Sequence, residues 1–262
     1  MALTQTIVGL LLRMRRAGLF DFGTARLLDL GEQNLYGDVR PQELPAIARA
    51  LKLPEARVAE IDADVARLVA AGGPLLAFDL AKRLYRIVFD CETYRAIDLN
   101  GTDIAWRHDL NAPLPVAETF DVVTNFGTSE HVFDQAQLFR SMHALTRPGG
   151  FMLHAVPSQG GPDHGFYNYH PTFFHDLAAA NSYRLPLLVL TSPGDEKGDR
   201  LDTLRDRDAF PALVARGELA REAGLFVALQ KPFEPRDFRV PLQGYYAGEL
   251  SAAGTRAWEQ RR

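Results

Sequence analysis

The sequence has a single cysteine and no long apolar run. Cys91 excludes an internal disulfide and is typical of a protein from a reducing compartment, so a cytoplasmic location is expected. The longest apolar run near the N-terminus, Ile7 to Leu12, is far too short to cross a bilayer. Positive charges follow this run, whereas a secretory signal places them in front, so an amphipathic first helix is predicted instead.

The sequence also has no excess of positive charge. Its formal net charge is −4 and its pI is about 6.0, which gives no electrostatic reason to expect nucleic acid or an anionic membrane as a partner. The stretch from Glu43 to Ile61 superficially looks like a helix-turn-helix, but Glu55, Glu60 and Asp62 on its second helix would repel phosphates. DNA binding is therefore not predicted.

Glycine is scarce where a dinucleotide site would need it. The first predicted strand, Thr24 to Leu30, ends at Gly31, which is a common entry point for a nucleotide-type ligand. The following residues contain no further glycine before Gly37, and Glu32 and Asp38 would oppose a pyrophosphate. Acidic residues at this turn are compatible with a cationic ligand. A nicotinamide-dependent oxidoreductase is consequently the least favoured enzyme class.

The stretch from Phe120 to Val156 contains the clearest structural pattern. It predicts a buried strand (120–126), a polar crossover (127–131), an amphipathic helix (132–146) and, after a Pro-Gly-Gly stop, a second buried strand (151–156). Such a βαβ unit predicts an α/β fold. Ligands bind at the carboxyl edges of open α/β sheets, so the crossover with Glu130 and His131 lies where a site is expected.

Two acidic residues end further predicted strands. Asp98 lies at the carboxyl end of the predicted strand Tyr94 to Leu99, and its paired oxygens suit the two hydroxyls of a ribose, although it could equally cap a turn. Asp109 ends a short strand that begins at Ile104; it could accept an exocyclic adenine amine or serve as a capping acid.

The loop from Pro157 to Leu177 is rich in aromatic residues and histidines. Such a loop can form the wall of a pocket, or its histidines can simply satisfy backbone groups. Residues that could bind a metal are present, namely His154, His164, His170, His175, Asp163 and Asp176. Only His170 and His175 have the sequence spacing of a typical ligand pair, and no further ligand set accompanies them. No metal is therefore predicted.

The chain is predicted to be one domain, residues 1–262, with two additions. Residues 40–89 are more than one crossover needs and predict an inserted helical pair that acts as a lid or an oligomer contact. Residues 232–262 form a C-terminal tail. A homo-oligomer through residues 40–89 is a possible assembly.

Together, the order of these elements resembles the class I S-adenosylmethionine-dependent methyltransferase family. The most specific stretch is FDVV, then SEHV, then LFRSMHALTRPGG; the family's usual glycines after the first strand are absent. The resemblance implies a seven-stranded, mostly parallel sheet with helices on both faces and an antiparallel last strand. It also implies S-adenosylmethionine as the methyl donor, held by Asp29, Gly31, Glu32, Gln33, Asp98, Leu99, Asp109, Leu110, Asn125 and Phe126.

Methyl transfer to a hydroxyl needs the acceptor's proton to be removed, and histidine is the usual base at neutral pH. His131, His164 and His170 are the candidates, and Phe166, Tyr167, Tyr169 and Phe173 are predicted to shape an acceptor pocket. We therefore expect O-methylation of a small molecule, without nucleic acid or membrane as partner. The alternative is an inactive methyltransferase-like binding or scaffold protein.

Overall fold

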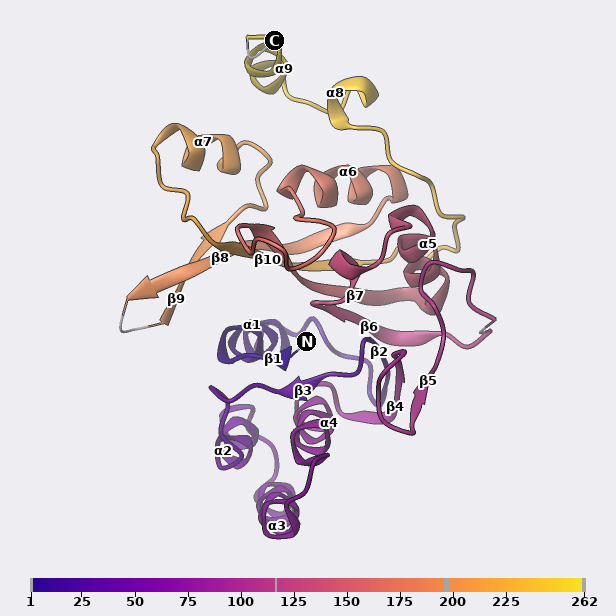
Figure 1. Ribbon diagram of the computed structural model, residues 1–262, viewed down its shortest axis with the longest axis vertical. Coiled ribbons are helices and arrows are strands. Elements are labelled where there is room, and N and C mark those ends of the chain that lie inside the picture. Colours follow the sequence, from indigo (N-terminus) through magenta and orange to yellow (C-terminus); the bar gives the residue numbers. More distant parts are fainter. Residues whose placement is uncertain (1, 116, 196–197, 261–262) are drawn as a thin grey trace. The chain divides into compact units, whose positions relative to one another are not determined.

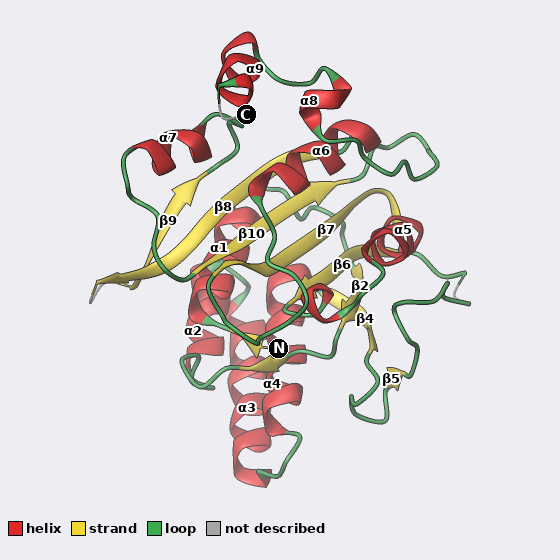
Figure 2. Cartoon of the chain, turned by 45° about the horizontal axis from the view of Figure 1, so that its top comes forward, coloured by secondary structure: helices red, strands yellow, loops and turns green. Residues whose placement is uncertain are grey.

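The computed structural model describes residues 2–115, 117–195 and 198–260. The chain forms two compact units. The first comprises the chain up to Asp109 together with Phe120–Thr128, and the second comprises Leu110–Thr119 together with the chain from Ser129 onward. Each unit has its own strands and helices, which are drawn in Figure 1 and coloured by type in Figure 2.

The first unit is built on parallel strands. They are β2 (Ala25–Leu30), β4 (Cys91–Ile97), β5 (Ala105–Trp106) and β6 (Phe120–Phe126), in the order β5-β4-β2-β6. Every residue of β6 is buried, as expected for a parallel strand covered on both faces. The register pairs Leu30 with Ile97 and with Asn125, so three strands end together at one edge of the sheet. A separate short pairing joins β1 (Ala2–Leu3) to β3 (Asn34–Leu35).

The helices of the first unit are α1 (Gln5–Arg16), α2 (Glu43–Ala50), α3 (Glu55–Ala71) and α4 (Leu76–Phe89). Residues 40–89 thus form α2, α3 and α4, where the sequence predicted a pair. Helix α4 is strongly apolar on one side and packs on β3 and β4, so it serves as the crossover helix. The excess over a simple crossover is therefore α2 and α3, which pack on each other and on α4.

The second unit contains antiparallel strands. They are β7 (Thr146–Gln159), β8 (Arg184–Asp195), β9 (Gly198–Thr203) and β10 (Ala223–Gln230), in the order β7-β10-β8-β9. The last strand, β10, is antiparallel to both neighbours, as predicted. Strand β9 is an addition to the seven strands predicted from the sequence. Its charged sequence carries no apolar alternation, so only the pairing with β8 reveals it as a strand.

The remaining elements of the second unit are a short 3-10 helix, η1 (Ser129–His131), and the helices α5 (Gln135–Leu145), α6 (Pro171–Asn181), α7 (Ala209–Ala215), α8 (Gly244–Ala247) and α9 (Ala252–Glu259). Helix α5 starts later than predicted because the Asp134 side chain caps it by accepting from the Gln137 amide. Strand β7 starts earlier, at Thr146, so Pro148 and both following glycines lie within it.

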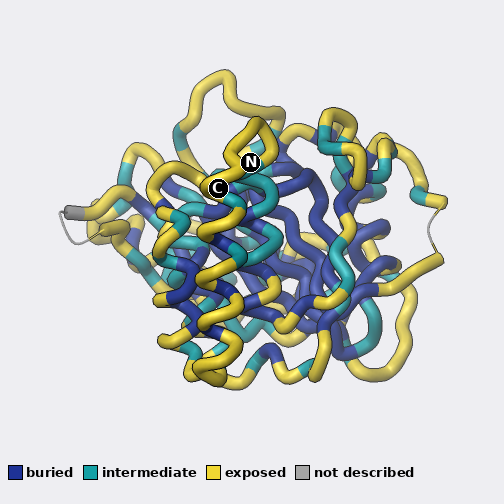
Figure 3. The backbone as a smooth tube through the Cα atoms, turned by 90° about the horizontal axis from the view of Figure 1, so that it is seen from below, coloured by how far each residue is buried: buried dark blue, intermediate teal, exposed yellow. Residues whose placement is uncertain are grey.

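The predicted α/β class and the antiparallel last strand are confirmed. In Figure 3 the interior segments are buried and the exposed residues lie on outer helices and loops. None of the helices in the described part of the chain has the length and apolar character needed to cross a membrane.

One backbone position controls where the loop after β7 begins. Gly160 has φ +81°, and a Cβ there would lie 2.7 Å from the Arg221 carbonyl oxygen. We expect Gly160→Ala to lower the free energy of unfolding by about 2–4 kcal/mol, from left-handed strain plus the backbone clash. Denaturant titration of the full chain measures this change. Gly217→Ala is the control, because Gly217 has φ +68° and open space around it. Equal losses in both variants would contradict the clash.

Candidate functional site

The carboxyl ends of β2, β4 and β6 form the candidate donor edge of the first unit. Gly31 follows β2 with φ +76°, a conformation that favours glycine, and its amide donates to the Ile97 carbonyl at 2.8 Å. Asn125 and Phe126 end β6 and are buried. The turn after β2 is therefore attached directly to the end of β4.

Asp98 is half-buried immediately after β4. One carboxylate oxygen accepts from the Glu32 amide at 2.9 Å, and the other accepts from the Asn100 amide at 2.8 Å. These two bonds fix the orientation of the carboxylate. Because a carboxylate has about four lone-pair directions, each oxygen keeps one for a ligand hydroxyl.

Glu32 is the first residue after the Gly31 turn, and its side chain is fully buried. Its two oxygens accept from the Thr102 amide at 2.6 Å and the Thr102 hydroxyl at 2.9 Å. Lys82 of α4 lies 3.2 Å from the same carboxylate. Glu32 therefore ties the loop after β4 to the turn after β2, and its charge is already paired.

Gln33 is buried beside Glu32 and is only partly satisfied. Its amide nitrogen donates to the Gly31 carbonyl at 2.9 Å and to the Phe126 carbonyl at 3.1 Å. These two acceptors set the orientation of the amide, and its oxygen is left buried without a hydrogen-bond partner in the described structure. An unsatisfied buried acceptor is costly, which makes this atom the best-suited partner here for a cationic ligand group.

Asp29 lies within the sheet and supports the turn. Its oxygens accept from Tyr85 at 2.9 Å, from Tyr94 at 2.7 Å and from the Thr124 hydroxyl, and the Gln33 amide is 3.4 Å away. Burial raises its pKa to about 6, against the opposing effect of these donors. All its acceptor capacity is used by the protein, so its role is structural.

The other candidates for the donor differ in exposure. Leu99, directly after Asp98, is 57% exposed. It offers an apolar surface on which a flat ring can pack. Asp109 is exposed. Leu110 belongs to the second unit and is buried there.

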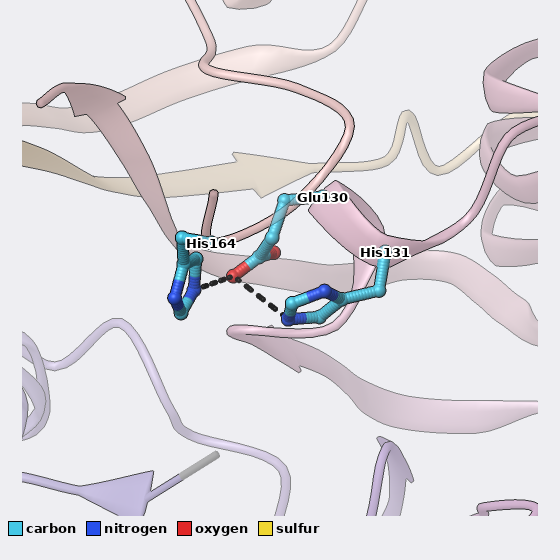
Figure 4. A group of neighbouring side chains, drawn as sticks. All are labelled: Glu130, His131 and His164. Carbon is cyan, nitrogen blue, oxygen red and sulfur yellow. Dashed lines mark ion pairs between the residues drawn. The ribbon is translucent and has the colours of Figure 1, made fainter. Parts of the chain in front are cut away.

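In the second unit, Glu130, His131 and His164 come together (Figure 4). Glu130 and His131 lie on η1, and His164 lies in the loop between β7 and α6. One Glu130 oxygen is 3.9 Å from Nε2 of His131 and 3.6 Å from Nε2 of His164. The carboxylate is buried while both rings are exposed, and burial raises the pKa of Glu130 although both histidines oppose that shift.

The loop that carries His164 is held on η1 by the backbone. The Phe166 amide donates to the Glu130 carbonyl at 2.7 Å. Gly165 permits this approach, because a Cβ there would lie 2.9 Å from the same carbonyl oxygen. The Tyr167 hydroxyl adds a bond of 2.9 Å to the Phe133 carbonyl. His164 is thus positioned by its neighbours in the sequence.

The predicted acceptor-pocket residues divide into two groups. Phe166 is exposed and meets the exposed ring of Phe133 edge-on, with centroids 5.8 Å apart. Tyr169 is buried, and Phe173 packs with it against Phe139. Phe166 and Tyr167 therefore lie near the Glu130 group, whereas Tyr169 and Phe173 belong mainly to an aromatic core.

His170, the third predicted base, lies elsewhere in the second unit. It caps α6, with Nδ1 accepting from the Thr172 amide at 3.2 Å. Burial and then Arg207 lower its pKa. Its ring lines a cavity of about 1110 Å³ whose wall also includes Phe173 but none of the Glu130 group. The structure thus brings His131 and His164 together and leaves His170 apart.

Of the metal-binding candidates considered from the sequence, only His164 joins a group of possible ligands among the described residues, with Glu130 and His131. His154 is buried between Phe139 and Phe174, and burial lowers its pKa to about 3. His175 contacts the Leu204 carbonyl at 3.0 Å, and Asp176 pairs with Arg207 at 2.6 Å. Glu130 was not among the metal-binding candidates predicted from the sequence; the adjacent Glu130-His131 pair at the end of the crossover was the available signal.

Comparison with known proteins finds similarity to methyltransferases over part of the chain. Residues 59–187 match a family model described as a methyltransferase domain. A curated relative, a probable S-adenosylmethionine-dependent methyltransferase of Mycolicibacterium smegmatis, is 34% identical over 89 residues, which cover 34% of this chain and 34% of that protein. The chain thus matches about a third of that relative's length.

Two solved structures are similar over most of the chain. The N-methyltransferase NodS of Bradyrhizobium japonicum, in complex with S-adenosyl-L-homocysteine, is 14% identical with a TM-score of 0.45, and 87% of each chain is covered. TehB of Haemophilus influenzae is 11% identical with a TM-score of 0.46, covering 87% of this chain and 63% of that one.

Asp29 gives a prediction about pH. A buried carboxyl whose pKa rises from 3.8 to about 6 on folding binds more protons folded than unfolded, so its contribution to stability is lost as pH rises through that window. The unfolding free energy of the wild type relative to Asp29→Asn should therefore fall by about 2 kcal/mol between pH 4 and pH 7. Denaturant titrations of both proteins across this range test it. A difference that is constant or rises with pH would contradict the assignment.

Proposed function

Residues 59–187 carry a methyltransferase domain, and from this premise we propose that the chain transfers a methyl group from S-adenosylmethionine to a small-molecule acceptor. The observation that carries the proposal is the donor edge of the first unit. Three features lie there on adjoining strand ends: a carboxylate with free lone pairs (Asp98), a glycine with positive φ (Gly31) and an unsatisfied buried acceptor (Gln33). The family match includes Asp98 but begins after residues 29–34.

The residues of the donor edge suit the parts of the donor. We assign the ribose hydroxyls to Asp98 and the methionine ammonium to the Gln33 amide oxygen, which gains the partner it lacks. Leu99 and Asp109 are assigned to the adenine, with Leu110, Asn125 and Phe126 as further contacts by family resemblance. Glu32 is assigned no donor contact, because Lys82 and Thr102 already occupy its carboxylate.

The donor supplies an activated methyl group on a sulfonium, and the transfer is an in-line displacement at that carbon. The protein's part is to align the acceptor with the methyl group, exclude water and dispose of the acceptor's proton. We place acceptor activation at Glu130, His131 and His164. This group combines a buried carboxylate with two accessible imidazoles, whereas His170 is used as a helix cap.

For the acceptor, we propose a small molecule with a ring and a hydroxyl. The exposed rings of Phe133 and Phe166, with Tyr167 beside them, offer aromatic surface on the loop that carries His164. A net charge of −4 favours neither a nucleic-acid acceptor nor an anionic surface. O-methylation remains our preferred assignment over transfer to nitrogen.

The second candidate is a methyltransferase-like binding protein without activity. It is favoured by one observation, the glycine-poor turn filled by the side chains of Glu32 and Gln33. Titration calorimetry with S-adenosylmethionine and S-adenosylhomocysteine separates the two candidates. Failure of both ligands to bind the folded chain would favour the binding protein.

Asp98 provides the sharper test of the donor site. Asp98→Asn replaces an acceptor oxygen by a donor, so we expect S-adenosylhomocysteine to bind about 10–100-fold more weakly, the loss typical of a charged hydrogen bond. Calorimetry measures the dissociation constant. Asp103→Asn is the matched control, since it removes the same charge from an exposed position in the same loop. Equal affinity in Asp98→Asn and wild type would remove Asp98 from the site.

A further inference from the structure

Glu130, His131 and His164 have a geometry beyond what acceptor binding alone requires. Each offers one ligand atom, and all three atoms lie within 4.8 Å of one another. We infer that these three residues form a binding site for a divalent transition-metal ion. Its role in acceptor activation rests on the proposed methyl transfer, but the site itself stands on the geometry.

The spacing of the ligand atoms agrees with a shared ion. Zinc bonds to imidazole nitrogen and carboxylate oxygen are about 2.0–2.1 Å long, so two ligands at a tetrahedral angle lie about 3.4 Å apart. The Glu130 oxygen is 3.6 Å from Nε2 of His164 and 3.9 Å from Nε2 of His131. Both distances are close to ligand spacing, whereas a direct hydrogen bond would need atoms about 3 Å apart.

The carboxylate supplies a second, independent observation. The other oxygen of Glu130, Oε2, is buried and has no hydrogen-bond partner among the described residues. Leaving a carboxylate oxygen buried and unpaired is expensive, since burial penalises its charge. A cation bound at this carboxylate offsets that cost. Glu130 thus differs from Asp29, whose oxygens accept from three side-chain hydroxyls.

The backbone holds this arrangement before any ion arrives. The Phe166 amide bonds to the Glu130 carbonyl at 2.7 Å, which fixes the His164 loop against η1. In addition, Gln135 donates from its side chain to the Ser129 carbonyl at 2.8 Å and so holds η1 to the start of α5. Two of the three ligands therefore come from a short, anchored segment.

The donor set selects the type of ion. Two imidazoles and one carboxylate suit zinc, iron or cobalt, whereas magnesium prefers an all-oxygen octahedron. Three protein ligands leave coordination positions open, as in catalytic sites rather than structural ones. The exposure of both rings leaves that open side accessible from solvent.

With an ion bound, His131 and His164 act as ligands, and the ion takes over the role expected of a histidine base. An acceptor hydroxyl that coordinates the ion becomes more acidic and releases its proton to water. The oxygen's electron pair then forms the new bond to the methyl carbon. The carbon–sulfur bond breaks with its electrons remaining on sulfur, which leaves S-adenosylhomocysteine as a neutral thioether.

Metal titration of the full chain tests the site without any turnover. The metal-free protein is titrated with Zn²⁺ by calorimetry and with Co²⁺ by visible absorption, in which imidazole ligands give characteristic bands. We expect one ion per chain, and at least tenfold weaker binding in Glu130→Gln and in His164→Asn, by analogy with losses seen for metal-site residues. Mg²⁺ should not compete at equal concentration.

Two matched variants control for charge and for histidine content. Asp163→Asn removes a charge next to His164, and His108→Asn removes a histidine of the first unit; both should keep wild-type affinity. Circular dichroism establishes that each variant is folded. The inference is overturned if Zn²⁺ fails to bind or if Glu130→Gln binds it as tightly as wild type. S-adenosylhomocysteine, titrated separately, reports on the proposed function independently.

Discussion

The first unit depends on a buried carboxylate whose acceptor capacity is filled from several elements at once. Asp29 of β2 accepts from Tyr85 of α4, from Tyr94 of β4 and from Thr124 of β6. A charge in the interior is tolerable only when such donors surround it, and even so burial raises its pKa to about 6. Because these donors come from three elements, their strand ends and the Gly31 turn are held in a fixed register. The donor edge inherits its geometry from this network.

The same principle distinguishes Asp29 from Glu130, another buried carboxylate. Asp29 is saturated by neutral hydroxyls, so it offers nothing to a ligand. Glu130 has two imidazoles near one oxygen, and its other oxygen has no hydrogen-bond partner among the described residues. A residue that binds a ligand must keep acceptor atoms without a protein partner, and this lowers the stability of the folded protein. The number of satisfied lone pairs, more than burial itself, therefore separates a structural acid from a functional one.

Much of the framework was readable from the sequence, because strands buried on both faces and amphipathic helices have strong periodic signals. Strand β6 matches its predicted bounds, and β2 lies within a residue of the strand predicted there. Strand β9 was missed because its charged sequence carries no apolar alternation, and its existence depends on the pairing with β8. The local sequence pattern thus predicted the elements that bury apolar surface. It failed for β9, which is held at the edge of the sheet by backbone hydrogen bonds.

The sequence predicted which residue types belong to the site, but not which of these residues contact one another. His131 and His164 were candidates by position, yet their meeting at one oxygen of Glu130 depends on a loop that folds back through Gly165. The family resemblance placed both Glu32 and Gln33 among the residues that hold the donor, and only side-chain contacts distinguish the two. Glu32 is taken up by Lys82 and Thr102, whereas Gln33 keeps an unsatisfied oxygen.

The Glu32 contacts explain how the turn can do without its usual glycines. Glycines at such a turn let ligand approach a bare backbone, but they leave the neighbouring loop free to move. Here a buried acid binds the amide and hydroxyl of Thr102 in the loop that follows Asp98, and Lys82 of α4 neutralises it. A charged contact of this kind is costly to break once buried. The turn is therefore held rigid by side chains. Helix α4 lies within residues 40–89, which looked like an insertion, and its Lys82 offsets the cost of burying the Glu32 charge.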